Sequence, residues 1–139
     1  MTFNFANEEH EETYHQFCKN YTVDPKNRDY NLLFYLLAAI ADKNCIDDLI
    51  EYKGNGRVQL KLDALHNGWV TGGDAQIIRL AFHLFNYGTP TVYYYDEDQI
   101  DKRHRETTEY YPVNLLDGLD YRLTDVALEA LRMYCYWYN

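Results

Sequence analysis

Serine is absent from all 139 residues of the chain. Every mechanism that needs a serine nucleophile, or a serine in a phosphate-binding loop, is therefore excluded. Cysteine is scarce: Cys18, Cys45 and Cys135 lie far apart and form no CxxC pair. An odd number of scattered cysteines argues against a disulfide framework. We expect three reduced, mostly buried thiols, as in a cytoplasmic protein.

Long apolar segments are also missing. The longest, residues 32–41, has about half the length that a membrane-spanning helix needs. Four glutamates between Glu8 and Glu12 occupy the place where a secretory signal would have its apolar core. We therefore expect a cytoplasmic protein with no membrane association.

Basic residues are too few to form a nucleic-acid-binding face. The chain has 13 Lys and Arg residues against 22 Asp and Glu residues, for a net charge of −9. Residues 1–51 and 94–139 carry most of the acidic residues, whereas residues 52–93 have a small basic excess. Direct nucleic-acid binding requires a basic surface, so we expect none. The acidic ends favour a basic protein partner, or they serve solubility.

The residues that are abundant predict a folded domain. Hydrophobic residues make up 47% of the chain and aromatic residues 17%, which excludes disorder over most of its length. Fifteen of the aromatic residues are tyrosines, which suit half-buried positions and interfaces. The length predicts one domain, residues 1–139.

Hydrophobic periodicity predicts a mainly α domain of about five helices. The pattern also allows one short β-hairpin. Asn7 is expected to cap the first helix and Thr124 the last. The second helix is apolar nearly all round and is predicted to form the centre of the core. The predicted helices span residues 8–21, 28–41, 42–52, 73–86 and 124–138.

Two short segments have the composition of strands, and a third that of a loop. Val58, Leu60 and Leu62 alternate with polar residues, and residues 91–95 are rich in tyrosine and β-branched residues. Residues 96–109 are highly charged and predict an exposed loop. The Gly54-Asn55-Gly56 turn is expected to end the third helix.

Two motifs in the middle of the chain carry a family resemblance. They are Gly68-Trp69-x-Thr71-Gly72 and Arg79-Leu80-Ala81-Phe82-x-Leu84-x-Asn86. With the apolar helix before them, they resemble a family of small uncharacterised proteins from Gram-positive bacteria and their phages and mobile elements. The resemblance extends over most of residues 10–132. It implies no activity, substrate or cofactor, but it implies a genomic setting in which small acidic proteins act against host defence systems.

No set of residues predicts a metal centre or a catalytic nucleophile. Glu12-x-x-His15 has the spacing found in carboxylate-bridged di-iron helices, but such a site needs two motifs and further carboxylates. The nearest repeat, Asp63-x-x-His66, lies beside a turn. Cys18 has no neighbour in the sequence that would lower the pKa of its thiol, so we expect a core residue. We therefore predict no metal, no cofactor and no enzymatic activity.

One acidic, tyrosine-rich segment is the main candidate for partner binding. Aromatic rings beside negative charges resemble the stacking groups and phosphates of a nucleic acid, and a basic channel would accept them. We therefore hypothesise a non-enzymatic counter-defence inhibitor, anti-CRISPR-like, that docks on a basic nucleic-acid-binding nuclease complex in the cytoplasm of a bacterial host. A solvated loop and a homodimer remain as other interpretations. The candidate residues are Tyr93, Tyr94, Tyr95, Asp96, Glu97, Asp98 and Asp101.

The alternative function is a small ligand-binding or catalytic domain. Its pocket would lie at the glycine-rich turn of residues 68–74, whose N–H groups could meet an anion at the start of a helix. The same turn is also typical of an ordinary helix start, with Asp74 as part of the cap. Arg79 is interpreted either as an ion-pair partner or as a site residue. The candidate pocket residues are Trp69, Thr71, Arg79 and Asn86.

Overall fold

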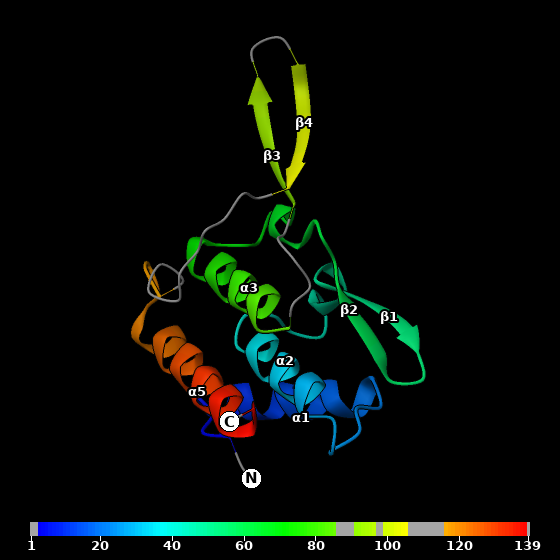
Figure 1. The fold of residues 1–139 in the computed structure, drawn as a ribbon, viewed down its shortest axis with the longest axis vertical. Helices are drawn as coiled ribbons and strands as arrows, with labels where there is room; N and C mark the ends of the chain where they lie inside the picture. The colour runs from blue at the N-terminus through cyan, green and yellow to red at the C-terminus, as the bar shows by residue number, and fades with distance from the viewer. Residues whose placement is uncertain (1–2, 86–90, 97–98, 106–115, 139) are drawn as a thin grey trace.

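The computed structural model describes residues 3–85, 91–96, 99–105 and 116–138, and helices predominate among them (Figure 1). The prediction of a mainly α fold with a short hairpin is confirmed. The described residues contain four α-helices, not the five or so that we predicted, and they form two hairpins. The elements are α1 (Glu8–Asn20), α2 (Arg28–Ala38), the 3-10 helices η1 (Ile46–Asp48) and η2 (Ala64–His66), β1 (Ile50–Gly54), β2 (Arg57–Leu60), α3 (Gly72–Leu84), β3 (Thr91–Asp96), β4 (Gln99–Arg105) and α5 (Tyr121–Tyr138).

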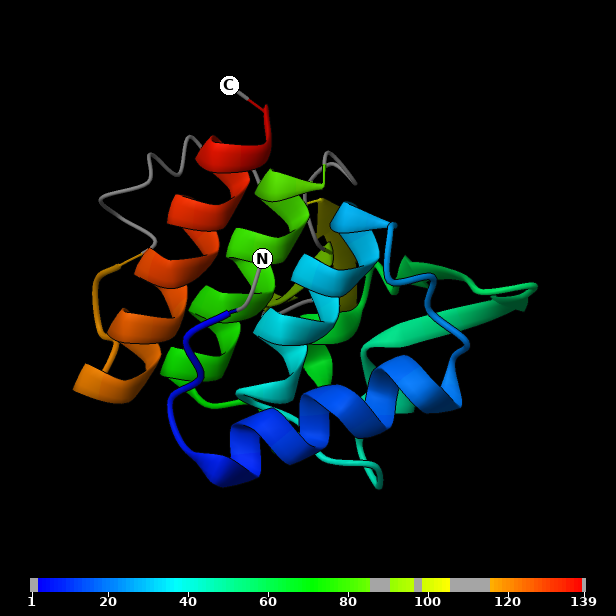
Figure 2. The same ribbon diagram turned by 90° about the horizontal axis from the view of Figure 1, so that it is seen from below.

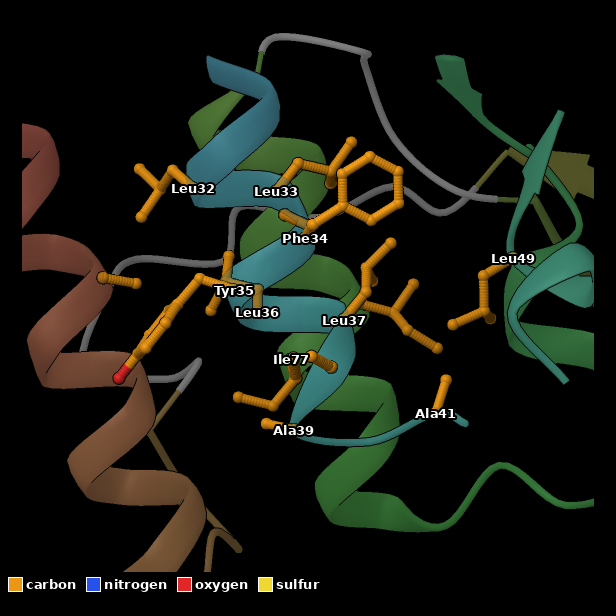
Figure 3. Close-up of a cluster of buried hydrophobic side chains, with 14 of the residues drawn as sticks. Leu32, Leu33, Phe34, Tyr35, Leu36, Leu37, Ala39, Ala41, Leu49 and Ile77 are labelled. Atoms are coloured by element: carbon orange, nitrogen blue, oxygen red, sulfur yellow. The ribbon is translucent and has the colours of Figure 1, made fainter. Parts of the chain in front are cut away.

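Helix α2 lies at the centre of the fold because, beyond its polar first turn, its surface is apolar on all sides. Residues 32–37 are fully buried, and the helix contacts α1, α3 and α5 (Figures 1 and 2). Figure 3 shows Leu37 directed toward Leu49, and Tyr35 directed toward α5. The predicted central helix is thus confirmed, although it ends at Ala38 and not at residue 41.

The helix starts follow short polar side chains. The Asn7 side chain accepts the N–H of His10 at 2.8 Å, as predicted for the cap of α1. For α5 the predicted cap is wrong. Asp120 accepts the N–H of Leu123 at 2.7 Å, and Thr124 lies one turn inside the helix. Both residue types can cap, and Asp120 comes first along the chain.

The predicted helix at residues 42–52 is wrong, because only η1 is helical and β1 follows it. The turn that was expected to end a helix instead closes a hairpin. Gly54, Asn55 and Gly56 all have positive φ angles, of 82°, 55° and 72°. Glycine is required at position 56, where an added Cβ would lie 2.9 Å from the carbonyl oxygen of Thr22. The predicted strand near residue 58 is confirmed as β2, which pairs antiparallel with β1.

The second hairpin extends away from the helices, and β3 contacts η2 near its base (Figure 1). Strand β3 confirms the strand predicted at residues 91–95. The exposed loop predicted at residues 96–109 is wrong for residues 99–105, which form β4 and pair antiparallel with β3. Its remaining residues beyond Asp96 lie outside the described residues.

The chain before α1 runs between α2 and α5 (Figure 2). The N–H of Asn4 donates to Glu129 on α5 at 3.0 Å. The carbonyl of Asn4 accepts the hydroxyl of Tyr35 at 2.7 Å, and the ring of Phe3 stacks on Tyr35 with centroids 4.5 Å apart. We call residues 3–7 the N-terminal strap, because they join the central helix to the last one.

Candidate functional site

The structure places the candidate partner-binding residues on one hairpin. Tyr93, Tyr94, Tyr95 and Asp96 belong to β3, and Asp101 belongs to β4. Glu97 and Asp98 lie outside the described residues. Because Asp96 pairs with Gln99, the acidic positions gather near the free end of the hairpin (Figure 1). The strand pairing therefore brings Asp101 toward the other candidates, which the sequence alone did not establish.

Basic residues on β4 were missed as part of this segment. Tyr93 lies opposite Arg103, and Tyr94 lies opposite Lys102. The positive charges of Lys102, Arg103 and Arg105 nearly balance the negative charges of the four acidic residues in the segment 91–105. The register thus separates charge along the hairpin, with acidic positions toward the free end and basic positions toward the body. The charged composition of residues 99–105 predicts a loop, so the sequence alone does not place these basic residues opposite the tyrosines of β3.

The glycine-rich turn of residues 68–74 forms a capping box. The hydroxyl of Thr71 accepts the N–H of Asp74 at 3.2 Å, and the Asp74 carboxylate accepts the N–H of Thr71 at 3.0 Å. Asp74 therefore caps α3, as the sequence predicted. Its carboxylate occupies the helix start, where an anionic ligand would otherwise bind.

The other residues of the alternative pocket make contacts of their own. The indole N–H of Trp69 donates to the Asp48 carboxylate at 2.9 Å, and the ring packs on the core. A guanidinium nitrogen of Arg79 donates to Gln76, one turn earlier on α3, at 3.1 Å. Asn86 lies outside the described residues. The pocket stays a prediction, and the polar groups of Trp69, Thr71 and Arg79 already form hydrogen bonds within the protein.

A buried histidine anchors the N-terminal strap. His10 is 2% exposed, and its Nδ1 accepts the N–H of Ala6 at 3.0 Å. The Nε2 atom therefore carries the proton and donates to the carbonyl oxygen of Tyr35 at 2.8 Å. Burial lowers the pKa of His10, and the positive charge of Arg122 acts in the same direction. The ring is thus held neutral, as its two hydrogen bonds require.

An ion pair on α5 completes this buried polar cluster. Glu129 is 7% exposed and accepts two hydrogen-bonding contacts from Arg132, at 2.7 and 2.6 Å, besides the N–H of Asn4. Burial raises the pKa of Tyr35, and the negative charge of Glu129 adds to the effect. The sequence pattern contains one indication of this cluster, because His10 and Glu129 are polar residues at positions where the helix faces are otherwise apolar.

Two cavities adjoin this cluster. One, of about 410 Å³, lies between the strap and α5 and is lined by Phe5, Asp125, Leu128 and Glu129, among others. The other, of about 290 Å³, lies at the end of α2, where Arg122 donates to the carbonyl oxygen of Ala39 at 2.8 Å. Arg122 thereby satisfies a carbonyl at a helix C-terminus. Sequence analysis singled out neither Glu129 nor Arg122 as a site residue.

The thiols correct one expectation. Cys18 and Cys45 are only half-buried and Cys135 is exposed, so the prediction of mostly buried thiols is wrong. Burial raises the pKa of Cys18 to about 11 and also raises that of Cys45. Both thiols are therefore protonated at neutral pH and are poor nucleophiles.

The described residues hold neither a metal-ligand cluster nor a helix suited to span a membrane. Among the described residues, no three His, Cys, Asp or Glu side chains gather as a metal site would require. The Nε2 atom of His15 lies 3.7 Å from a carboxylate oxygen of Glu11, on the exposed face of α1. None of the described helices combines the length and apolar character needed to cross a bilayer.

Comparison with known proteins identified one family. The model of DUF6075, described as a family of unknown function, matches residues 1–134. Neither a curated protein nor a solved structure matches the chain. The family agrees with the expected uncharacterised domain, whereas the Gram-positive and mobile-element setting stays a prediction.

Proposed function

The chain belongs to the DUF6075 family, and we propose that it is a non-enzymatic module that binds another protein through the β3–β4 hairpin. The proposed partner is a basic nucleic-acid-handling protein of a bacterial host, such as a defence nuclease complex. In this role the protein is a phage or mobile-element inhibitor with an anti-CRISPR-like action. It works in the host cytoplasm and contacts neither nucleic acid nor membrane directly.

The observation that carries the proposal is the projection of the hairpin away from the helices (Figure 1). Within the described residues, the β3–β4 sheet has two strands, so each strand has an outer edge without a neighbour among those residues. A two-stranded hairpin is at best marginally stable without packing. A partner that covers this hairpin would supply the missing contacts and could pair with a free edge.

The charge layout supports a basic partner. Asp96 and Asp101 lie toward the free end, and the basic positions Lys102, Arg103 and Arg105 lie nearer the body. The free end would therefore enter a cationic channel first, with tyrosines behind it. A net charge of −9 on the whole chain would add attraction over longer distances. By occupying the channel, the hairpin would exclude the nucleic acid without any chemical step.

A functional test uses cells that carry an active defence nuclease. Expression of the protein should restore phage plating, and the purified protein should compete with the guide or target nucleic acid for the nuclease. A panel of purified nucleases of different classes identifies the partner. Unchanged plating together with no competition across the panel would contradict the proposed role.

The binding site is tested with charge reversals. In the D96K/E97K/D98K variant, association with the partner should slow strongly, with little change in dissociation, because charges near an interface mainly steer encounter. The control is E9K/E12K, which reverses two exposed acidic residues on α1. Equal binding by both variants at low and high salt would assign the contact to another surface.

A further inference from the structure

We propose that the outer face of α5 is a self-association surface, and that its partner is a second copy of this chain, packed with its own α5 antiparallel to the first. The inference is independent of the hairpin function, because α5 lies in the helical body and the hairpin projects from it (Figure 1). Each surface can therefore fail its own test without affecting the other.

The outer face of α5 carries large apolar and aromatic side chains. Tyr121 is 94% exposed, Leu128 is 49% exposed and Tyr136 is 66% exposed. The core-facing side of α5 lies opposite, with Leu123, Ala127, Ala130 and Met133 buried against the protein. A helix on the surface of a monomer normally presents polar residues outward.

These exposed residues form one stripe along the helix. Tyr121, Asp125, Leu128, Arg132 and Cys135 follow one another at spacings of 4, 3, 4 and 3 residues. This is the heptad spacing that keeps a row of side chains in line along a neighbouring helix. At 100° per residue, these residues and Tyr136 together occupy an arc of about 100°. The stripe is therefore narrow enough to be covered by a single partner helix.

The stripe is complementary to itself when two copies run antiparallel. If the two-fold axis passes between positions 128 and 129, Asp125 of each copy lies opposite Arg132 of the other. The same axis places Tyr121 opposite Tyr136, and the two Leu128 side chains meet near the crossing point. One register thus gives two ion pairs, two aromatic pairs and an apolar centre.

A parallel arrangement would lack this complementarity. Each Asp125 would then face its own counterpart, and so would each Arg132, which places like charges together. Arg132 can serve the antiparallel pair because its side chain remains 54% exposed while it contacts Glu129. Its charge is thus available at the surface, and Glu129 holds the side chain in position.

A groove beside the stripe provides room for a partner side chain. The cavity of about 410 Å³ is lined by Phe5, Asp125, Leu128 and Arg132, so it opens along one flank of the stripe. Leu128 of a second copy would lie next to this groove in the antiparallel register. Burial of apolar side chains there would add to the two ion pairs.

The first test measures molecular mass by sedimentation equilibrium from micromolar to near-millimolar protein. We expect the mass to rise from one chain toward two chains. A mass of one chain at the highest concentration would overturn the proposal.

Two matched leucines locate the surface. Leu128→Asp places charges at the centre of the contact and should abolish association. Leu62→Asp is the control, since Leu62 is 46% exposed and lies between β2 and η2, outside α5. The control should associate as the parent does. If both variants associate equally, α5 is not the surface.

A charge exchange tests the antiparallel register. Asp125→Arg alone should weaken self-association at least about tenfold, because two arginines then meet at each ion pair. The second variant, Arg132→Glu with Glu129→Gln, should also associate poorly, because its acidic residue faces Asp125. A mixture of the two should recover association, since each pair then has opposite charges. If both variants are folded by circular dichroism and their mixture does not associate, the antiparallel register is wrong. The comparison of the two leucine variants does not depend on these charge variants.

Discussion

The Nε2 atom of His10 donates a hydrogen bond to the main-chain carbonyl of Tyr35 at 2.8 Å, which joins α1 to the central helix. On the other side of the ring, Nδ1 accepts the N–H of Ala6. Both bonds can form only with a neutral ring, because a protonated imidazole has no acceptor. The attachment of the N-terminal strap therefore depends on the charge of one buried side chain.

This dependence predicts a loss of stability in mild acid. Burial lowers the native pKa of His10 below the usual value of 6.5, so the unfolded state binds the proton first as pH falls. The contribution of the neutral ring is complete above pH 6.5, and it is lost progressively as pH falls through 6.5 toward the lower native value. The measurement is the free energy of unfolding by denaturant across this range.

Two substitutions separate His10 from the other histidines. His10→Gln should remove much of the pH dependence in this range, because glutamine does not titrate. His15→Gln is the control, because His15 is exposed on α1 and the bonds of His10 to Ala6 and Tyr35 remain in this variant, so the loss of stability in acid should persist. A His10→Gln profile identical to that of the parent would contradict the assignment.

Thr71 is expected to contribute to stability through the cap of α3. Thr71→Ala should lower the free energy of unfolding by about 1 kcal/mol, because the N–H of Asp74 loses its acceptor. Thr71→Ser keeps the hydroxyl and should change it little. Equal losses for alanine and serine would mean that the methyl group, and not the hydroxyl, is important here.

Leu36 tests the central position of α2. The side chain is fully buried, so Leu36→Ala should cost about 2–5 kcal/mol through lost burial and the cavity left behind. Leu62→Ala, at an exposed position, should cost less than about 0.5 kcal/mol. Denaturant titration of both variants measures the difference. A cost well below about 1 kcal/mol for Leu36→Ala would place α2 outside the core.

The thiols should differ in reactivity. Cys135 is exposed and should react fastest with a thiol-specific reagent, whereas Cys18, with a pKa raised to about 11, should react slowly until the protein unfolds.

Melting should be insensitive to reductant and to EDTA, because we expect neither a disulfide nor a metal. A large drop in the melting temperature with EDTA would reopen the Glu12/His15 hypothesis.

Local patterns were sufficient for the main helices. The apolar surface of residues 32–37 predicted a buried helix, since no other arrangement removes all sides of such a helix from water. Asn7 and Asp74 were correctly predicted to cap helices, because capping involves only neighbours along the chain. Strand β1 was missed for the opposite reason. Its pairing joins Ile50 to Leu60 across a turn, while the spacing of nearby apolar residues also fits a helix.

The sequence alone thus determined a mainly helical, acidic domain with a central apolar helix, because composition and periodicity act locally along the chain. Only the tertiary structure brought His10 to Tyr35 and Asn4 to Glu129, and placed β4 beside β3. His10 and Tyr35 are far apart in the sequence, as are Asn4 and Glu129, and many other polar residues could have met them. Strand β4 follows β3 closely along the chain, but its charged composition favours a loop, and only the strand pairing shows otherwise. Tertiary packing also decided which face of α5 is buried and left Tyr121, Leu128 and Tyr136 exposed to solvent.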